Sequence, residues 1–337
     1  MAVVGEFDLI ERYFKRPARR AALGVGDDCA LLQLPPGLQM AISSDMLVSG
    51  RHFFADVNPR HLGHKAMAVN LSDLAACGAR PLAFTLALAL PEANHAWLAA
   101  FSDGLLTLAD AHDCELIGGD TTQGPLNICI TVFGEVPVVD GRSQALLRSG
   151  AQAGDDLYVS GTLGDARLAL EVRQGPSTLR WPDAVMADAR LRLECPTPRV
   201  ALGQALRGVA TAALDVSDGL LGDLGHILKA SRVGATINVD IATSLIAAHA
   251  DYTRARGQFD TEISAGQWRH WALAGGDDYE LLFTAPPDQR DAVAAAALAS
   301  HTPVTRIGHI DTELDLRLMD TQGQRVANTF VSFDHFR

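Results

Sequence analysis

The 337-residue sequence is short of positive charge. Its 28 lysines and arginines stand against 40 aspartates and glutamates, which leaves a formal net charge of −12. No run of basic residues is longer than the pair in ARR at residues 18–20. A protein that binds nucleic acid needs a basic patch to contact the phosphates. We therefore expect no nucleic-acid partner.

Paired cysteines and long apolar runs are also missing. The five cysteines form no C-x-x-C pair, which disfavours a zinc site or a disulfide framework and indicates reduced thiols. The longest apolar run, PLAFTLALALP at residues 81–91, is too short to span a bilayer. The N-terminus lacks the basic start and apolar core of a signal peptide. These absences predict a cytoplasmic protein with no membrane partner.

Several common catalytic motifs are absent as well. The sequence contains no Gly-Lys-Ser/Thr of a P-loop, no G-x-S-x-G, no kinase H-R-D and no H-E-x-x-H. GVGDDC at residues 24–29 falls one glycine short of G-x-G-x-x-G. Its two acids, Asp27 and Asp28, would repel a pyrophosphate. A glycine-rich loop that presents carboxylates must therefore meet phosphate in some other way.

Hydrophobic periodicity indicates two alternating units of strands and helices. In the first half we predict a helix that begins at Asn58 as N-cap and ends at Gly78. A second helix covers 95–112, and strands cover 40–48, 82–90, 114–119 and 126–136. The texture changes after VVDGRS, and the polar stretch from Asp251 to Trp271 is expected to be a surface loop. The fold class is α/β to α+β, with domains at 1–145 and 146–337.

Many carboxylates lie in turns or at predicted strand ends, beside glycine or serine. They are Asp27, Asp28, Asp45, Asp120, Asp215, Asp218, Asp277 and Asp278, and Asp73 joins them from a predicted helix. Each alone could be an ordinary turn or cap residue. Together they would repel one another unless divalent cations neutralised them. Mg²⁺ bridges protein carboxylates to substrate phosphates, so the set predicts a magnesium-dependent phosphoryl-transfer site.

Seven segments, in this order, closely resemble the thiamine-monophosphate kinase family of the aminoimidazole ribonucleotide synthetase-like superfamily. They are GVGDDCALL, SSDMLVSGRHF, HKAMAVNLSDLAACGARP, LIGGDTT, RSGAQAGDDLYVSG, LDVSDGL and GGDDYELLFT. The resemblance implies ATP-dependent phosphorylation of thiamine monophosphate to thiamine diphosphate. It also implies a homodimer, in which the N-terminal ATP/Mg-binding domain forms a dimer-spanning β-barrel. A C-terminal α+β domain would complete the nucleotide and thiamine sites.

The resemblance also implies roles for individual residues. As Mg²⁺ ligands it implies Asp28, Ser43, Ser44, Asp45, Asp73, Asp120, Asp215 and Asp218, of which Asp45, Asp73 and Asp120 are the catalytic choices. Contacts to ATP would come from Gly119, Asp120, Arg148 and Ser217. The thiamine side would be contacted by His52, Glu280 and Phe333. Several Mg²⁺ ions are expected, and the sequence leaves open whether K⁺ assists.

Two alternatives remain open at the level of sequence. One is another ATP-dependent activity of the superfamily, such as cyclisation in purine synthesis, selenophosphate synthesis or hydrogenase maturation. The N-terminus shows no reactive cysteine of the kind usual in selenophosphate synthesis. The other alternative is a non-catalytic Mg-nucleotide sensor or scaffold. Binding of ATP without formation of a product would favour the sensor.

Overall fold

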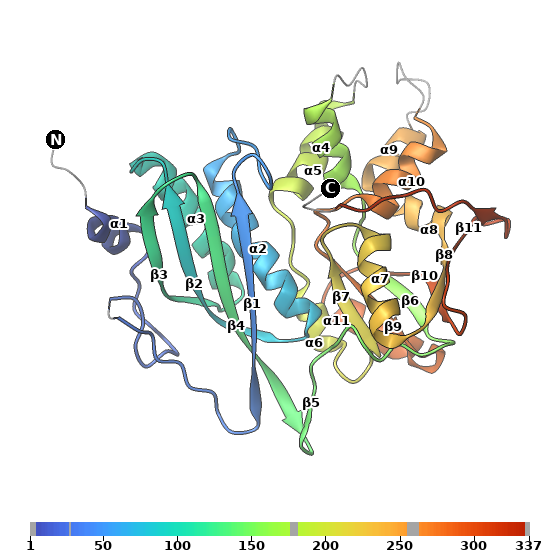
Figure 1. The fold of residues 1–337 in the computed structure, drawn as a ribbon, viewed down its shortest axis with the longest axis horizontal. Coiled ribbons are helices and arrows are strands. Elements are labelled where there is room, and N and C mark those ends of the chain that lie inside the picture. Colours follow the sequence, from blue (N-terminus) through green and yellow to red (C-terminus); the bar gives the residue numbers. More distant parts are fainter. Residues whose placement is uncertain (1–4, 27, 176–180, 255–262, 334–337) are drawn as a thin grey trace. The chain divides into compact units, whose positions relative to one another are not determined.

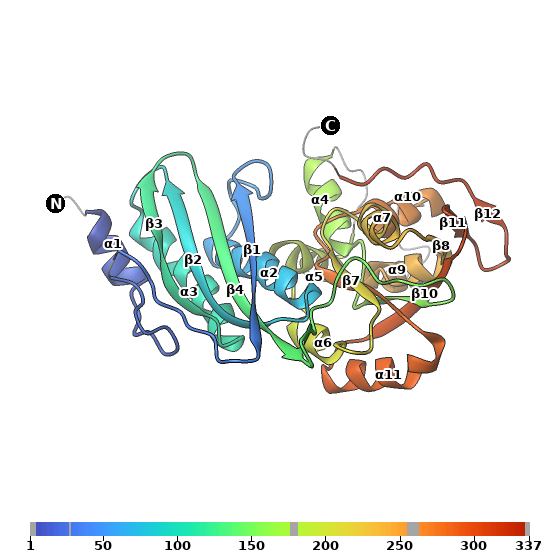
Figure 2. The same ribbon diagram turned by 60° about the horizontal axis from the view of Figure 1, so that its bottom comes forward.

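The chain folds into two compact units in the computed structural model, which describes residues 5–26, 28–175, 181–254 and 263–333. One unit comprises Met1–Leu74 and Ala79–Ala145, and the other comprises Ala75–Gly78 and Leu146–Arg337. Figures 1 and 2 show that each unit combines a β-sheet with helices. The fold is therefore mixed α/β in both units.

The first unit is built on a sheet with the strand order β1-β4-β2-β3. Strands β2 and β3 are parallel, and the other neighbours in this order are antiparallel. The short strand β5 pairs with β4. The elements are α1 (Glu6–Tyr13), β1 (Leu38–Val48), α2 (Pro59–Ala76), β2 (Arg80–Leu90), α3 (His95–Ala111), β3 (Glu115–Gln123), β4 (Asn127–Val139) and β5 (Arg142–Ser143).

One face of this sheet is covered by helices α2 and α3, which Figure 2 shows side by side behind the strands. The covered face carries apolar side chains at alternate positions, such as Leu86 and Ile130, as the two-residue period of a strand requires. The opposite face carries Ile42 and Met46, which are 62% and 52% exposed. The sheet thus has one buried face and one face that is partly apolar and open.

Helix α2 begins and ends where the sequence predicts. The Asn58 side chain accepts a hydrogen bond from the backbone N–H of Arg60 at 2.9 Å, as an N-terminal cap does. At the other end Gly78 has φ of +67°, a conformation that glycine adopts without steric cost. The predicted strand at 40–48 and helix at 95–112 are likewise confirmed as β1 and α3.

The segment of residues 14–37, here called the N-terminal strap, lies between α1 and β1. Leu23 and Leu31 form an antiparallel bridge, which brackets the glycine-rich turn of residues 24–29. Ala21 packs with Leu82 and Ile117 of the sheet. Hydrogen bonds also tie the strap to the sheet. The Glu115 carboxylate on β3 accepts them from three consecutive backbone N–H groups, those of residues 19, 20 and 21, at 2.6, 3.0 and 2.7 Å.

The second unit has a sheet with the order β12-β11-β8-β10-β6-β9-β7, mostly antiparallel, with β11 and β8 parallel. Helices α7, α8 and α10 lie on one side of it, and α6 and α11 on the other (Figures 1 and 2). Its elements are β6 (Asp156–Ser160), α4 (Asp165–Gln174), α5 (Asp183–Glu194), α6 (Val200–Ala205), β7 (Ala212–Val216), α7 (Leu220–Ser231), β8 (Gly234–Asn238), α8 (Val239–Ser244), α9 (Ala247–Arg254), α10 (Ala265–Ala274), β9 (Glu280–Ala285), a 3₁₀ turn (Pro287–Gln289), α11 (Arg290–Ala299), β10 (Val304–Asp311), β11 (Leu316–Met319) and β12 (Arg325–Val326).

The surface loop predicted from Asp251 to Trp271 is wrong at both of its ends. Its first residues complete α9 and its last residues lie in α10, while residues 255–262 fall outside the described part of the chain. Ser264 caps α10 by accepting a hydrogen bond from Gln267 N at 3.1 Å. Trp268 and Trp271 are buried against each other, with ring centroids 5.0 Å apart. Tertiary packing of these two rings overrides the polar character of the local sequence.

The sequence predicts that the Gly-Gly-Asp of residues 118–120 lies at the end of a strand. It lies inside β3 instead. Gly119 allows the strand to continue, because its φ of +147° is one that side chains rarely adopt. In the described residues the first sheet is open, with β1 and β3 as its edges, and forms no closed barrel. The dimer-spanning barrel therefore stays a prediction. Within the described ranges no helix is long and apolar enough to cross a membrane.

We expect Glu115→Gln to lower the free energy of unfolding by about 1–3 kcal/mol at neutral pH, because the amide would turn an N–H donor toward a backbone N–H that now has an acceptor. Although burial raises the pKa of Glu115, the three backbone donors and Arg19 bring it below its ordinary value. The ionised carboxylate therefore stabilises the fold above the pKa of an unfolded glutamate, about 4.3. This stabilisation is lost as the pH falls through the lower, folded pKa.

The measurement is urea unfolding of wild type and variant between pH 3 and 7. The difference between the two should be largest near pH 7 and should shrink in the acid range. Glu11→Gln is the matched control, because Glu11 is 67% exposed and forms a surface ion pair with Lys15, four positions along the chain. An equal effect of both variants would contradict the role given to Glu115.

Candidate functional site

Two elements of the first unit bring together four of the polar residues around the predicted site, here called the strand–helix cluster: Ser43, Asp45, Asn70 and Asp73. Ser43 and Asp45 are two positions apart on β1 and share its helix-covered face. Asn70 and Asp73 are three positions apart on α2 and share one side of that helix. The Ser43 hydroxyl donates to the Asp73 carboxylate, and Asp45 N donates to Asn70 Oδ1 at 3.2 Å. Asp45 and Asp73 therefore approach the same surface.

Asn70 is a member of this cluster that the sequence reasoning did not single out. It is 1% exposed, and its Nδ2 donates to the Ala66 carbonyl oxygen at 2.9 Å. That bond fixes the amide so that Oδ1 faces Asp45 N. The signal in the sequence was the spacing in NLSD, which places an amide one helical turn before Asp73. Asn70 holds the backbone of Asp45 in register with α2.

The other side chains predicted to bind metal in this unit lie elsewhere. The Ser44 hydroxyl contacts the Ile130 carbonyl oxygen at 3.0 Å and Thr131 Oγ1 at 3.1 Å, because alternation turns it to the open face. Asp120 lies on β3, three strand spacings or about 14 Å across the sheet from β1. Magnesium ligands lie about 2.1 Å from the ion. Within one sheet Asp120 and Asp45 thus cannot share an ion.

The glycine-rich segment GVGDDC belongs to the N-terminal strap. Asp28 is exposed there, and Asp27 lies outside the described residues. His52 follows β1, and its Nδ1 accepts a hydrogen bond from Val48 N at 3.0 Å. An imidazole nitrogen that accepts cannot carry the proton, so the neutral ring holds it on Nε2. The ring is thereby oriented to donate from Nε2.

In the second unit, three segments meet at residues 217–219, here called the Ser217 loop, which joins β7 to α7. The GGDDY segment reaches it through Asp277 N, which donates to Ser217 O at 2.9 Å. The C-terminal segment reaches it through Phe333 N, which donates to Asp218 O at 3.1 Å. The predicted residues Ser217, Asp218 and Phe333 are thus brought together, and Asp215 lies on β7 directly before them.

The Ser217 loop is held from within by a carboxylate that the sequence reasoning missed. Asp223 Oδ2 accepts hydrogen bonds from Ser217 N, Asp218 N and Gly219 N at 3.0, 3.0 and 3.1 Å. Burial, and next the charge of Asp218, raise the pKa of Asp223 to about 6 in spite of these three donors. The surroundings of Asp223 therefore disfavour its ionised form, beside the residues predicted to bind metal and nucleotide.

Glu280, predicted to contact thiamine, is fully buried in the second unit. Its carboxylate accepts from Arg199 at 2.6 and 2.6 Å, from Arg192 at 2.8 Å and from the Ser160 hydroxyl at 2.6 Å. Removing one partner of a buried pair of this kind costs about 3–5 kcal/mol. The geometry gives Glu280 a structural role in joining β9 to the arginines, and its contact with thiamine stays a prediction.

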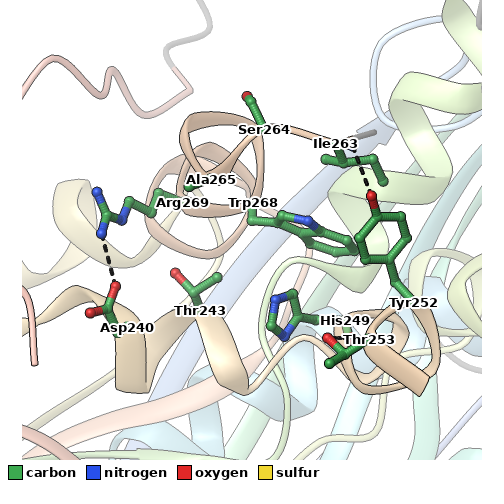
Figure 3. A pocket seen from close by; sticks show the side chains of 10 residues that line it. All are labelled: Asp240, Thr243, His249, Tyr252, Thr253, Ile263, Ser264, Ala265, Trp268 and Arg269. Atoms are coloured by element: carbon green, nitrogen blue, oxygen red, sulfur yellow. Dashed lines mark hydrogen bonds and ion pairs between the residues drawn. The ribbon is translucent and has the colours of Figure 1, made fainter. Parts of the chain in front are cut away.

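A pocket of about 520 Å³ lies in the second unit between α8, α9 and α10 (Figure 3). Its wall is aromatic, with Tyr252, Trp268 and His249, and Arg269 pairs with Asp240 at its rim at 2.9 Å. None of the predicted site residues lines this pocket. Much of its wall comes from α9 and α10, where the sequence predicts a surface loop.

Arg148, the predicted cationic contact for ATP, is exposed on the segment that enters the second unit. Its carbonyl oxygen accepts a hydrogen bond from Ser231 Oγ at 3.2 Å, which ties this segment to the end of α7. Within the described residues no group of three or more His, Cys, Asp or Glu side chains is close enough to hold a metal ion alone. The acids occur as smaller sets on separate elements.

Known proteins match both units. A family model for the N-terminal domain of AIR synthase related proteins matches residues 26–136, and the corresponding C-terminal model matches residues 152–320. Thiamine-monophosphate kinase of Escherichia coli (strain K12) is 44% identical over 336 residues, which cover 98% of each chain. The same enzyme of Salmonella typhimurium is 44% identical over 339 residues, again 98% of each chain. The chain belongs to the thiamine-monophosphate kinase family.

Solved structures agree with this membership. The crystal structure of thiamine-monophosphate kinase from Stenotrophomonas maltophilia K279a is 47% identical, with a TM-score of 0.79 over 91% of this chain and 92% of that one. A structure of AaThiL complexed with AMPPCP and TMP is 27% identical, with a TM-score of 0.73 over 90% and 89%. The hydrogenase maturation protein HypE, at 21% identity and a TM-score of 0.71, shares the fold alone. The thiamine-monophosphate kinase family thus has the two-domain AIR synthase-like fold expected for this chain.

In this member of the thiamine-monophosphate kinase family, two adjacent glycines on β3 allow a matched test of how Asp120 is placed. A Cβ at Gly119 would lie 1.9 Å from the Leu86 carbonyl oxygen, whereas a Cβ at Gly118 would lie 3.7 Å from Thr85 Cγ2. Gly119→Ala should therefore lower the free energy of unfolding by about 1–3 kcal/mol or more. Gly118→Ala should change it by no more than about 0.5 kcal/mol.

Chemical denaturation of both variants measures this difference. Equal stability of the two would contradict the close approach of β2 and β3 at Gly119.

Proposed function

We propose that this chain transfers the γ-phosphoryl group of ATP directly to the terminal phosphate of thiamine monophosphate, which yields thiamine diphosphate and ADP. The observation that carries the proposal is similarity over nearly the full length to kinases of this name. A relative of the same fold is described in complex with AMPPCP and TMP. The acids of both units, displayed without a P-loop lysine, support the same chemistry.

The donor set fits Mg²⁺. In the strand–helix cluster, Asp45 and Asp73 offer carboxylate oxygens beside the Ser43 hydroxyl, and in the second unit Asp215 and Asp218 offer two more carboxylates. Asp120 lies three strands away from Asp45 in the sheet, so these acids would not bind a single ion, which favours several ions. Bound there, Mg²⁺ would neutralise the phosphates and stabilise the charge that shifts during transfer.

The chain's own side chains would bind and orient the two substrates. His52 presents its Nε2 proton to an anionic oxygen, and we assign it to the phosphate of thiamine monophosphate. Arg148 and the Ser217 hydroxyl are assigned to ATP. The acceptor is a phosphate oxygen that is largely ionised near neutral pH, so no strong general base is required. The main task of these residues is to hold two polyanions in line.

We also propose that the protein is a homodimer whose open sheets pack together as the dimer-spanning barrel. The support comes from the open face of the first sheet, where Ile42 and Met46 expose most of their side chains among Ser44 and Thr131. Apolar side chains exposed on one face of a sheet are typical of an interaction surface. Light scattering during gel filtration should give twice the mass of one chain. A single-chain mass at micromolar concentration would contradict the dimer.

The decisive assay incubates the purified full chain with ATP, Mg²⁺ and thiamine monophosphate and separates the products. Thiamine diphosphate and ADP should form in equal amounts. Asp45→Asn should lower turnover by about 100-fold or more, the scale expected when a group that stabilises transition-state charge is lost. The fold should survive, because an isosteric amide replaces the carboxylate.

Asp103→Asn is the matched control and should keep full activity, since Asp103 is 57% exposed on α3 and forms a surface ion pair with Arg60. ADP without thiamine diphosphate would place the acceptor elsewhere in the superfamily. Bound ATP with neither product would favour a nucleotide sensor. Near-normal turnover of Asp45→Asn at saturating Mg²⁺ would refute the role given to this residue.

A further inference from the structure

The Ser217 loop precedes the N-terminus of helix α7, a place where proteins often bind phosphate through free backbone N–H groups. Here those groups are already used. Asp223, in the first turns of α7 and 5% exposed, accepts the N–H groups of all three loop residues with one oxygen, at 3.0 to 3.1 Å. A phosphate could therefore reach these amides only by displacing a buried carboxylate.

Neighbouring contacts leave the loop little freedom to adopt another conformation. Gly219 has φ of +120°, and a Cβ there would lie 2.8 Å from the Ala274 carbonyl carbon. Asp277 N and Phe333 N hold the carbonyl oxygens of Ser217 and Asp218. The donors are thus held by Asp223 and the acceptors by two other segments. These backbone groups are thus used within the protein, so the loop would contact a ligand through the side chains of Ser217 and Asp218.

We propose that Asp223 is a positioning residue, whose side-chain oxygen occupies the amide site of the Ser217 loop so that the loop contacts Mg-nucleotide through its side chains. This inference rests on the proposed function. The inference goes beyond the proposed function because it assigns a role to Asp223, a residue that would touch neither substrate nor metal. The protein itself supplies the acceptor for the N–H groups before α7, and the cations would bind the nucleotide phosphates.

The test compares three variants of the full chain by calorimetric titration with AMPPCP in the presence of Mg²⁺. Asp223→Ala removes the acceptor, so the loop amides lose their partner and the dissociation constant should rise at least 10-fold. Asp223→Asn keeps an oxygen that can accept the three N–H groups, and its dissociation constant should stay within about 3-fold of wild type.

Asp155→Ala is the matched control for loss of a buried acid. Asp155 is 4% exposed, and its Oδ2 accepts from Gln152 N at 2.9 Å and Thr211 Oγ1 at 2.6 Å, away from the Ser217 loop. It should destabilise the fold without weakening nucleotide binding. Urea unfolding of all three variants separates lost stability from lost affinity.

A second measurement reports on the amides themselves. Inorganic phosphate should bind Asp223→Ala and compete with AMPPCP, because the vacated N–H groups would accept an anion, and it should not compete in wild type or in Asp155→Ala. The inference is overturned if Asp223→Ala binds AMPPCP as tightly as Asp155→Ala, or if Asp223→Asn is as weak as Asp223→Ala. Failure of wild type itself to bind AMPPCP with Mg²⁺ would instead refute the proposed function.

Discussion

A carboxylate that accepts three consecutive backbone N–H groups is the interaction on which the acidic loops of this protein depend. Each unit has one in its described part, at Glu115 for residues 19–21 and at Asp223 for the Ser217 loop. In both places the amides that could have bound a phosphate are satisfied internally. The nearby chain then presents aspartates, Asp28 in the strap and Asp218 in the loop.

The regular elements place the remaining acids by their periods. Two positions on β1 and three positions on α2 bring Ser43 and Asp45 against Asp73 and Asn70. The same alternation sends Ser44 to the open face of the sheet. Carboxylates that line a phosphate site repel the phosphates unless cations lie between them, and the chain has a net charge of −12. This arrangement supports the proposal that divalent metal assists phosphate binding.

The sequence predicts those parts of the fold and site that depend on local signals. The cap at Asn58, the stop at Gly78 and the apolar period gave α2 with its neighbours, and the ordered motifs gave the family. Features set by distant partners were not readable. The burial of Glu280 depends on Arg192 and Arg199, more than 80 positions away in the chain. The hydrogen bonds from the Ser217 loop to Asp223 depend on a backbone turn that the composition of the segment does not predict.

The most direct test of the account is a calorimetric titration of AMPPCP into the wild-type protein, with Mg²⁺ and with EDTA in its place. Binding is expected only when Mg²⁺ is present, since the loop amides are occupied and the carboxylates would repel bare phosphate. Equal affinity in EDTA would contradict it, because the phosphates would then be held by protein groups alone.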